Sequence, residues 1–90
     1  MDLFLIGYDL VKEGQNYDGL IQAIKSLPGT GWHHLDSTWV LRSSGTAPEI
    51  RDILVRHLGP NDKLLVVQLT GEGAWSGFND EGSQWLMDNL

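Results

Sequence analysis

The sequence predicts an α+β fold in which four strands and two helices follow one another in the order β-α-β-β-α-β. Residues 3–10 and 63–70 are short, strongly apolar runs with the length of buried strands. Between them, two segments repeat apolar residues at helical spacing, and they enclose a stretch rich in aromatic and β-branched residues. These observations predict one small domain with both strands and helices.

The first strand, residues 3–10, has apolar side chains on both of its faces. Phe4 and Ile6 point to one side and Leu3 and Leu5 to the other, because successive side chains of a strand alternate. A strand of this kind is normally central and covered on both sides. We therefore expect helices on one face and a second cover on the other.

The next element is a helix that begins near Asn16 and ends at Pro28-Gly29. Asn16 is the expected N-cap, because its side chain can accept a backbone hydrogen bond there. Apolar residues then recur at i, i+3, i+4 and i+7, as Leu20, Ala23, Ile24 and Leu27.

Two strands are expected next, over residues 31–35 and 38–43. Residues 32–42 are rich in aromatic and β-branched side chains, and Asp36 and Ser37 in their middle favour a tight turn or a bulge.

The second helix has the clearest start in the chain. Thr46 and Glu49 form a capping-box pattern, with Pro48 in the first turn, where its missing N–H is tolerated. The apolar stripe continues through Ile50, Ile53, Leu54, His57 and Leu58, and Gly59-Pro60 should end it.

This order of elements is that of the ferredoxin-like fold, in which both helices cover one face of a four-stranded antiparallel sheet. We assign residues 1–71 to this domain and residues 72–90 to an acidic, Trp-rich C-terminal segment. The other face of the sheet needs a cover, which this segment or a two-fold dimer partner would supply. The residues of the segment expected to pack on the sheet or on a partner are Trp75, Phe78, Trp85 and Leu86.

Composition excludes several functions. The chain has no cysteine, so thiol catalysis and thiolate zinc sites are excluded. No apolar run approaches the roughly 20 residues that a membrane-spanning helix needs. Asp2 occupies a position where a signal peptide would carry basic residues, and we expect a cytoplasmic protein. The net charge of −6, with dispersed basic residues, disfavours binding to RNA or DNA.

Three segments resemble the CRISPR-associated protein 2 family: Gly7-Tyr8-Asp9-Leu10, the run from Leu35 to Val40, and the run from Asp62 to Val67. The resemblance covers roughly residues 3–70 and is closest to stand-alone bacterial members labelled SinR family. It implies a ferredoxin-like homodimer in which the two copies of Asp9 face each other and hold a divalent metal such as Mg²⁺. Members of that family have been assigned metal-dependent endonuclease activity on RNA or duplex DNA, and in the spacer-acquisition complex they act as a scaffold.

The resemblance also singles out residues near Asp9. The family often has a serine followed by an aromatic residue in its third strand, and Ser37 and Trp39 stand in similar places. Tyr8 precedes the aspartate within the matching motif. These residues are the expected accessory positions of the site.

Simpler roles remain open for each candidate. Asp9 could cap the adjacent loop rather than bind Mg²⁺. His33 and His34 are adjacent on a strand, so they point to opposite faces and cannot chelate one metal as a pair. One of them near Asp36 could act as a general base, although a hydrogen-bonded structural role is commoner. Trp39 is expected in the core rather than stacked on a base.

Two functions therefore remain. The first is a homodimeric metal-dependent endonuclease with Asp9 as its catalytic and metal-binding residue. The second is a non-catalytic scaffold that binds a basic protein partner through its acidic surface. Fold resemblance alone does not decide between them.

Overall fold

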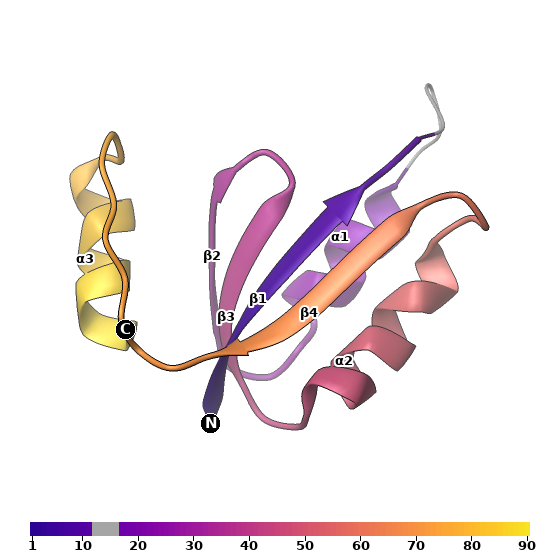
Figure 1. Cartoon of the computed structure of the whole chain (residues 1–90), viewed down its shortest axis with the longest axis horizontal. Helices are drawn as coiled ribbons and strands as arrows, with labels where there is room; N and C mark the ends of the chain where they lie inside the picture. Colours follow the sequence, from indigo (N-terminus) through magenta and orange to yellow (C-terminus); the bar gives the residue numbers. More distant parts are fainter. Residues whose placement is uncertain (12–16) are drawn as a thin grey trace.

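The sheet has four antiparallel strands in the order β2-β3-β1-β4 (Figure 1). The computed structural model describes residues 1–11 and 17–90. The strands are β1 (Asp2–Asp9), β2 (Thr30–Leu35), β3 (Thr38–Ser43) and β4 (Lys63–Leu69). The predicted α+β fold with a four-stranded antiparallel sheet is confirmed, and β1 is a central strand, as its two apolar faces require.

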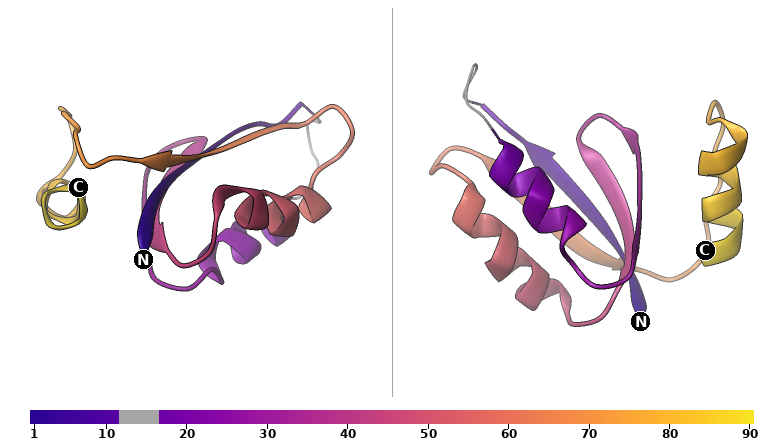
Figure 2. Two further views of the ribbon diagram at one scale, coloured as in Figure 1. Left: turned by 60° about the horizontal axis from the view of Figure 1, so that its bottom comes forward. Right: turned by 180° about the vertical axis from the view of Figure 1, so that it is seen from behind.

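Two helices, α1 (Asp18–Lys25) and α2 (Ala47–Leu54), lie together on one face of the sheet (Figure 2). A short 3₁₀ turn (Val55–His57) extends α2. A third helix, α3 (Asp80–Asn89), lies beyond the edge strand β2, at the edge of the sheet away from β4 (Figure 1). Within the described residues no helix combines the length and the apolar character needed to cross a bilayer.

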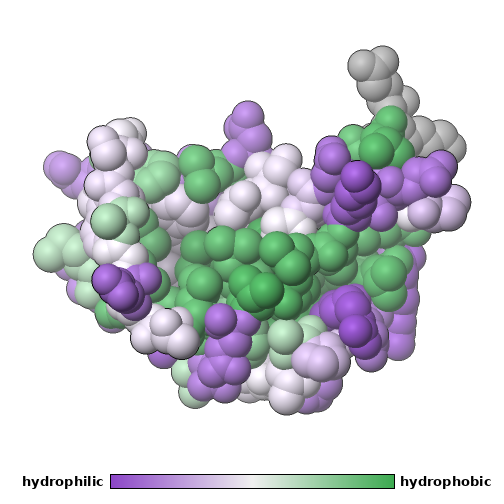
Figure 3. Space-filling view, in the orientation of Figure 1, coloured by the Kyte–Doolittle hydropathy of each residue, from purple (hydrophilic) through white to green (hydrophobic). Residues whose placement is uncertain are grey.

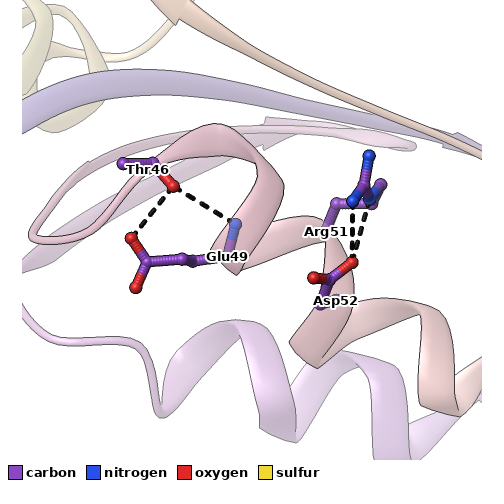
Figure 4. Close-up of polar contacts among 4 residues, drawn as sticks. All are labelled: Thr46, Glu49, Arg51 and Asp52. Atoms are coloured by element: carbon purple, nitrogen blue, oxygen red, sulfur yellow. Dashed lines mark hydrogen bonds and ion pairs between the residues drawn. The ribbon is translucent and has the colours of Figure 1, made fainter.

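The predicted start of α2 at Thr46 is confirmed, with Thr46 as the N-cap residue. The Thr46 hydroxyl accepts a hydrogen bond from the Glu49 N–H and donates one to the Glu49 carboxylate (Figure 4). Pro48 lies in the first turn. The first of these contacts satisfies the Glu49 N–H, a backbone donor that has no partner within the helix.

The predicted apolar stripe of α2 is wrong at Ile53, whose side chain is 42% exposed. Ile50 and Leu54, one turn apart, already occupy the side of α2 that faces the sheet, and Ile53 is rotated away from it. The helix also ends earlier than expected, at Leu54, and the chain tightens into the 3₁₀ turn before Leu58.

The start of α1 also differs from the sequence pattern. The expected N-cap, Asn16, lies outside the described residues. Helix α1 begins at Asp18, with Tyr17 as its N-cap residue and no side-chain cap.

Between the helices and the sheet lies the main core. It combines residues of the two central strands with the buried sides of α1 and α2: Phe4, Ile6, Trp39, Leu41, Leu20, Ile24, Ile50 and Leu54. Trp39 is 5% exposed, so its expected place in the core is confirmed.

A second, smaller core forms on the opposite face. Leu3, Trp32 and Val40 of the sheet pack against Leu86 of α3, and the partly buried Trp75, Phe78 and Trp85 join them. The C-terminal segment of the chain therefore packs on its own sheet. Asn79 is the N-cap of helix α3, because its side chain accepts a hydrogen bond from the Gly82 N–H at 2.8 Å.

Candidate functional site

The face of the sheet opposite α1 and α2, which we call the open face, is covered only over part of its width. Pairing sets Leu5 of β1 beside Val67 of β4, and Gly7 beside Leu65. Leu65 is 55% exposed and Val67 37% exposed, although both are aliphatic. Figure 3 shows a continuous hydrophobic area in the middle of the molecule. A contiguous exposed apolar patch on a sheet face is typical of an interaction site.

A groove separates this area from the C-terminal segment. Its volume is about 310 Å³, and one wall is the sheet while the other is the chain from Gly73 to Leu90. Its lining includes Trp32, Leu35, Val40, Trp75, Phe78 and Leu86. None of the described residues that line it has a charged side chain, so the groove suits an apolar occupant.

Helix α3 forms the far wall because the sheet holds both of its ends. The Trp32 indole N–H donates to the Gly82 carbonyl at 3.0 Å. Arg42 donates from Nε to the Asn89 side-chain oxygen at 3.0 Å, and it also donates to the Asn89 carbonyl. A cation at the C-terminal end of a helix is stabilised by the helix dipole. Sequence reasoning missed Arg42, whose partner lies 47 positions further along the chain.

Asp9 ends β1 at the margin of the open face. It is exposed, and by strand alternation its side chain shares the face of Leu3 and Leu5. In the sheet it is paired with Lys63 of β4. The two residues border a shallow hollow of about 250 Å³ above Gly7, where the missing side chain leaves space.

Among the described residues, Asp9 belongs to no cluster of metal ligands. The part of the chain that the structure describes contains no group of three or more His, Cys, Asp or Glu residues that could hold a metal ion. A hard cation such as Mg²⁺ binds through one or two carboxylates and keeps several waters. The carboxylate of Asp9 fits such a cation, and a second copy of the chain would supply a second carboxylate.

Three of the accessory positions, Tyr8, His33 and Trp39, lie on the helix-covered face of the sheet. The Tyr8 hydroxyl accepts a hydrogen bond from the Trp39 indole N–H at 3.2 Å, within the helix-covered core. The His33 ring stacks on Trp39 with centroids 3.8 Å apart, and its Nε2 lies 3.4 Å from the Asp36 carbonyl oxygen. The structure thus brings Tyr8, His33 and Trp39 together, but not with Asp9.

His34 lies on the opposite side from His33, as strand alternation predicts. Its ring centroid is 5.3 Å from that of Trp32 and 6.2 Å from that of Phe78. A Cβ atom built on Gly82 would lie 3.2 Å from the His34 ring, so the ring packs closely against α3. His34 is therefore part of the contact between β2 and α3.

Ser37 lies exposed in the turn between β2 and β3. Its backbone carbonyl accepts a hydrogen bond from the Tyr8 N–H at 3.1 Å, which extends the pairing of β1 past Thr38, the first residue of β3. This contact is made by the main chain, so it does not depend on the serine hydroxyl.

Taken together, the fold and the surface define a ferredoxin-like α+β protein with one sheet face closed by two helices and the other half-covered by its C-terminal segment. Comparison with protein-family models, with curated proteins and with solved structures finds no significant match for this chain.

Proposed function

We propose that this chain is a homodimeric module whose two copies pack together through their open faces. The observation that supports this proposal is the exposure of Leu65 and Val67 on a sheet face whose other half is buried. Burying such apolar surface in a two-fold interface removes it from water. A chain of 90 residues has a small core of its own, so the additional burial also stabilises the fold.

A second candidate function depends on the same dimer. Asp9 is exposed at the edge of the open face, where it can meet its copy in the partner. Two carboxylates would hold Mg²⁺, which polarises a phosphoryl oxygen or activates a water for attack on phosphorus. This is the metal-dependent endonuclease activity implied by the resemblance to CRISPR-associated protein 2. The net charge of −6 and the proximity of Lys63 to Asp9 favour a non-catalytic scaffold with a basic protein partner instead.

The dimer is tested by multi-angle light scattering after gel filtration. We expect a particle of twice the 10.0 kDa chain mass, and we expect Leu65→Asp to elute as a monomer, because a buried carboxylate without a partner is costly. Val55→Asp is the matched control, since Val55 is 49% exposed on the helix side of the molecule. A monomeric wild-type chain would contradict the proposal.

The endonuclease is tested by cleavage of labelled single-stranded RNA and duplex DNA with Mg²⁺, Mn²⁺ or EDTA. If Asp9 holds the metal, cleavage requires a divalent cation and is lost in Asp9→Asn, while the variant remains a dimer. If the dimer neither cleaves nor binds these substrates at low salt, the endonuclease is contradicted. The scaffold is then the remaining function.

A further inference from the structure

We infer that the two copies are related by a two-fold axis parallel to the strands, so that β4 of each copy lies over the groove of the other. The inference rests on the proposed dimer and specifies its interface. In this arrangement the groove of one copy receives the exposed aliphatic side chains of the other.

The open face has two unlike halves. On the β4 side, Leu65 and Val67 are exposed. On the β2 side, the groove is bounded by the C-terminal segment and runs along Trp32, Val40 and Trp75. One half therefore carries exposed aliphatic side chains, and the other half is hollow.

Symmetry decides which halves meet. In a two-fold interface, if residue i contacts residue j, then j contacts i. When two sheets pack face to face, an axis parallel to the strands sets the β4 side of one copy over the β2 side of the other. An axis across the strands sets β4 over β4 and leaves the two grooves facing each other. Only the first arrangement fills the grooves.

The sheet register identifies the residues that should meet. Gly7 of β1 is paired with Thr38 on one side and with Leu65 on the other, so these three residues lie at one level along the strands. An axis parallel to the strands and close to β1 preserves this level. It places Leu65 of one copy over Thr38 of the other, and Thr38 lines the groove.

The chemistry of the two halves agrees with this arrangement, and the area shows what else must take part. Leu65 and Val67 are aliphatic, and the groove is lined by uncharged side chains. Four strands about 4.8 Å apart and about 20 Å long give roughly 400 Å² for the sheet face alone. A standard interface buries about 800 Å² on each partner. The C-terminal wall of the groove must therefore contribute if the dimer is to be stable.

The same axis has a consequence for Asp9. Because Asp9 ends β1, an axis parallel to the strands keeps both copies of it at the same end of the interface. An axis across the strands would set them at opposite ends, about 20 Å or more apart. The arrangement that fills the grooves is thus also the one in which the two carboxylates can meet.

Single-cysteine variants test the inference, because the chain has no cysteine of its own. Tagged Leu65→Cys is mixed with untagged Thr38→Cys, allowed to exchange subunits, and treated with a short bismaleimide cross-linker. Both variants must first elute with the wild-type protein. We expect the mixed product at about tenfold or more above either variant alone, since proximity in a complex acts as a millimolar concentration.

Val67→Cys alone is the diagnostic for the opposite geometry. An axis across the middle of the strands sets Val67 over its own copy, so this variant would cross-link to itself while the Leu65 and Thr38 mixture would not. That pattern would overturn the inference and leave the dimer standing. A wild-type chain that is monomeric in light scattering would overturn both.

Discussion

Arg42 of β3 donates a hydrogen bond from Nε to Oδ1 of Asn89, at 3.0 Å, and so ties the sheet to the last turn of α3. The same guanidinium donates from its Nη1 to the Met1 carbonyl at 3.1 Å. One side chain thus joins the N-terminal end of β1, the end of β3 and the end of α3. The groove depends on this contact, because α3 is its far wall.

Loss of the Arg42 contacts should release α3. We expect Arg42→Ala to lower the free energy of unfolding by about 1–3 kcal/mol, since hydrogen bonds from a charged group contribute about that much. Partial exposure of Trp85 should shift tryptophan fluorescence to longer wavelength. Arg56→Ala, at an exposed position, is the control and should change the unfolding free energy by less than about 0.5 kcal/mol. Equal effects of the two variants would contradict the assigned role.

The hydrogen bond from Trp32 to Gly82 can be removed while the aromatic ring is kept. Trp32→Phe should cost about 1 kcal/mol and increase hydrogen exchange in α3, because the Gly82 carbonyl loses its donor. Trp39→Phe is the matched variant, since it removes the hydrogen bond to Tyr8 instead. Trp39→Phe should increase hydrogen exchange in β1 and β3. If it increased exchange in α3 as well, the hydrogen bond from Trp32 to Gly82 would not be the contact that specifically protects α3.

Alanine substitutions at Gly29 and Gly45 compare the cost of a steric clash with the cost of backbone strain. Both have positive φ, of 108° and 93°, but a Cβ on Gly29 would lie 1.8 Å from the Arg42 carbonyl oxygen, whereas nothing lies within 4 Å of one on Gly45. We expect Gly45→Ala to cost about 1 kcal/mol from the left-handed conformation alone. Gly29→Ala should cost more than about 3 kcal/mol or prevent folding, because backbone must move. Urea unfolding measures both, and equal costs would refute the clash.

The two polar contacts of α2 in Figure 4 should differ in their effect on stability. Thr46→Ala removes the N-cap and should cost about 1 kcal/mol. Asp52→Asn breaks the ion pair with Arg51, whose two side chains are 58% and 63% exposed, and should cost less than about 0.5 kcal/mol. Urea midpoints compare the two variants directly. A larger loss in Asp52→Asn would show that the ion pair matters more than the cap.

Elements encoded within a few residues could be predicted from the sequence. The two apolar faces of residues 3–10 indicated a central strand, and β1 lies between β3 and β4. Thr46 and Glu49 located the start of α2. Alternation also placed His33 and His34 on opposite faces. Each of these features depends on periodicity or on a cap a few positions away, so the tertiary path of the chain does not alter it.

Other features required the tertiary structure, because they join residues far apart in the chain. Trp32 meets Gly82 across 50 positions and Arg42 meets Asn89 across 47, and no local pattern marks either pair. Ile53 fits the apolar stripe by spacing, but its side chain is exposed because the sheet lies against Ile50 and Leu54. The sequence by itself determined the elements, their order and the alternating faces of the strands. The groove, and the exposure of Leu65 and Val67 beside it, depend on the path of residues 72–90, which only tertiary packing decides.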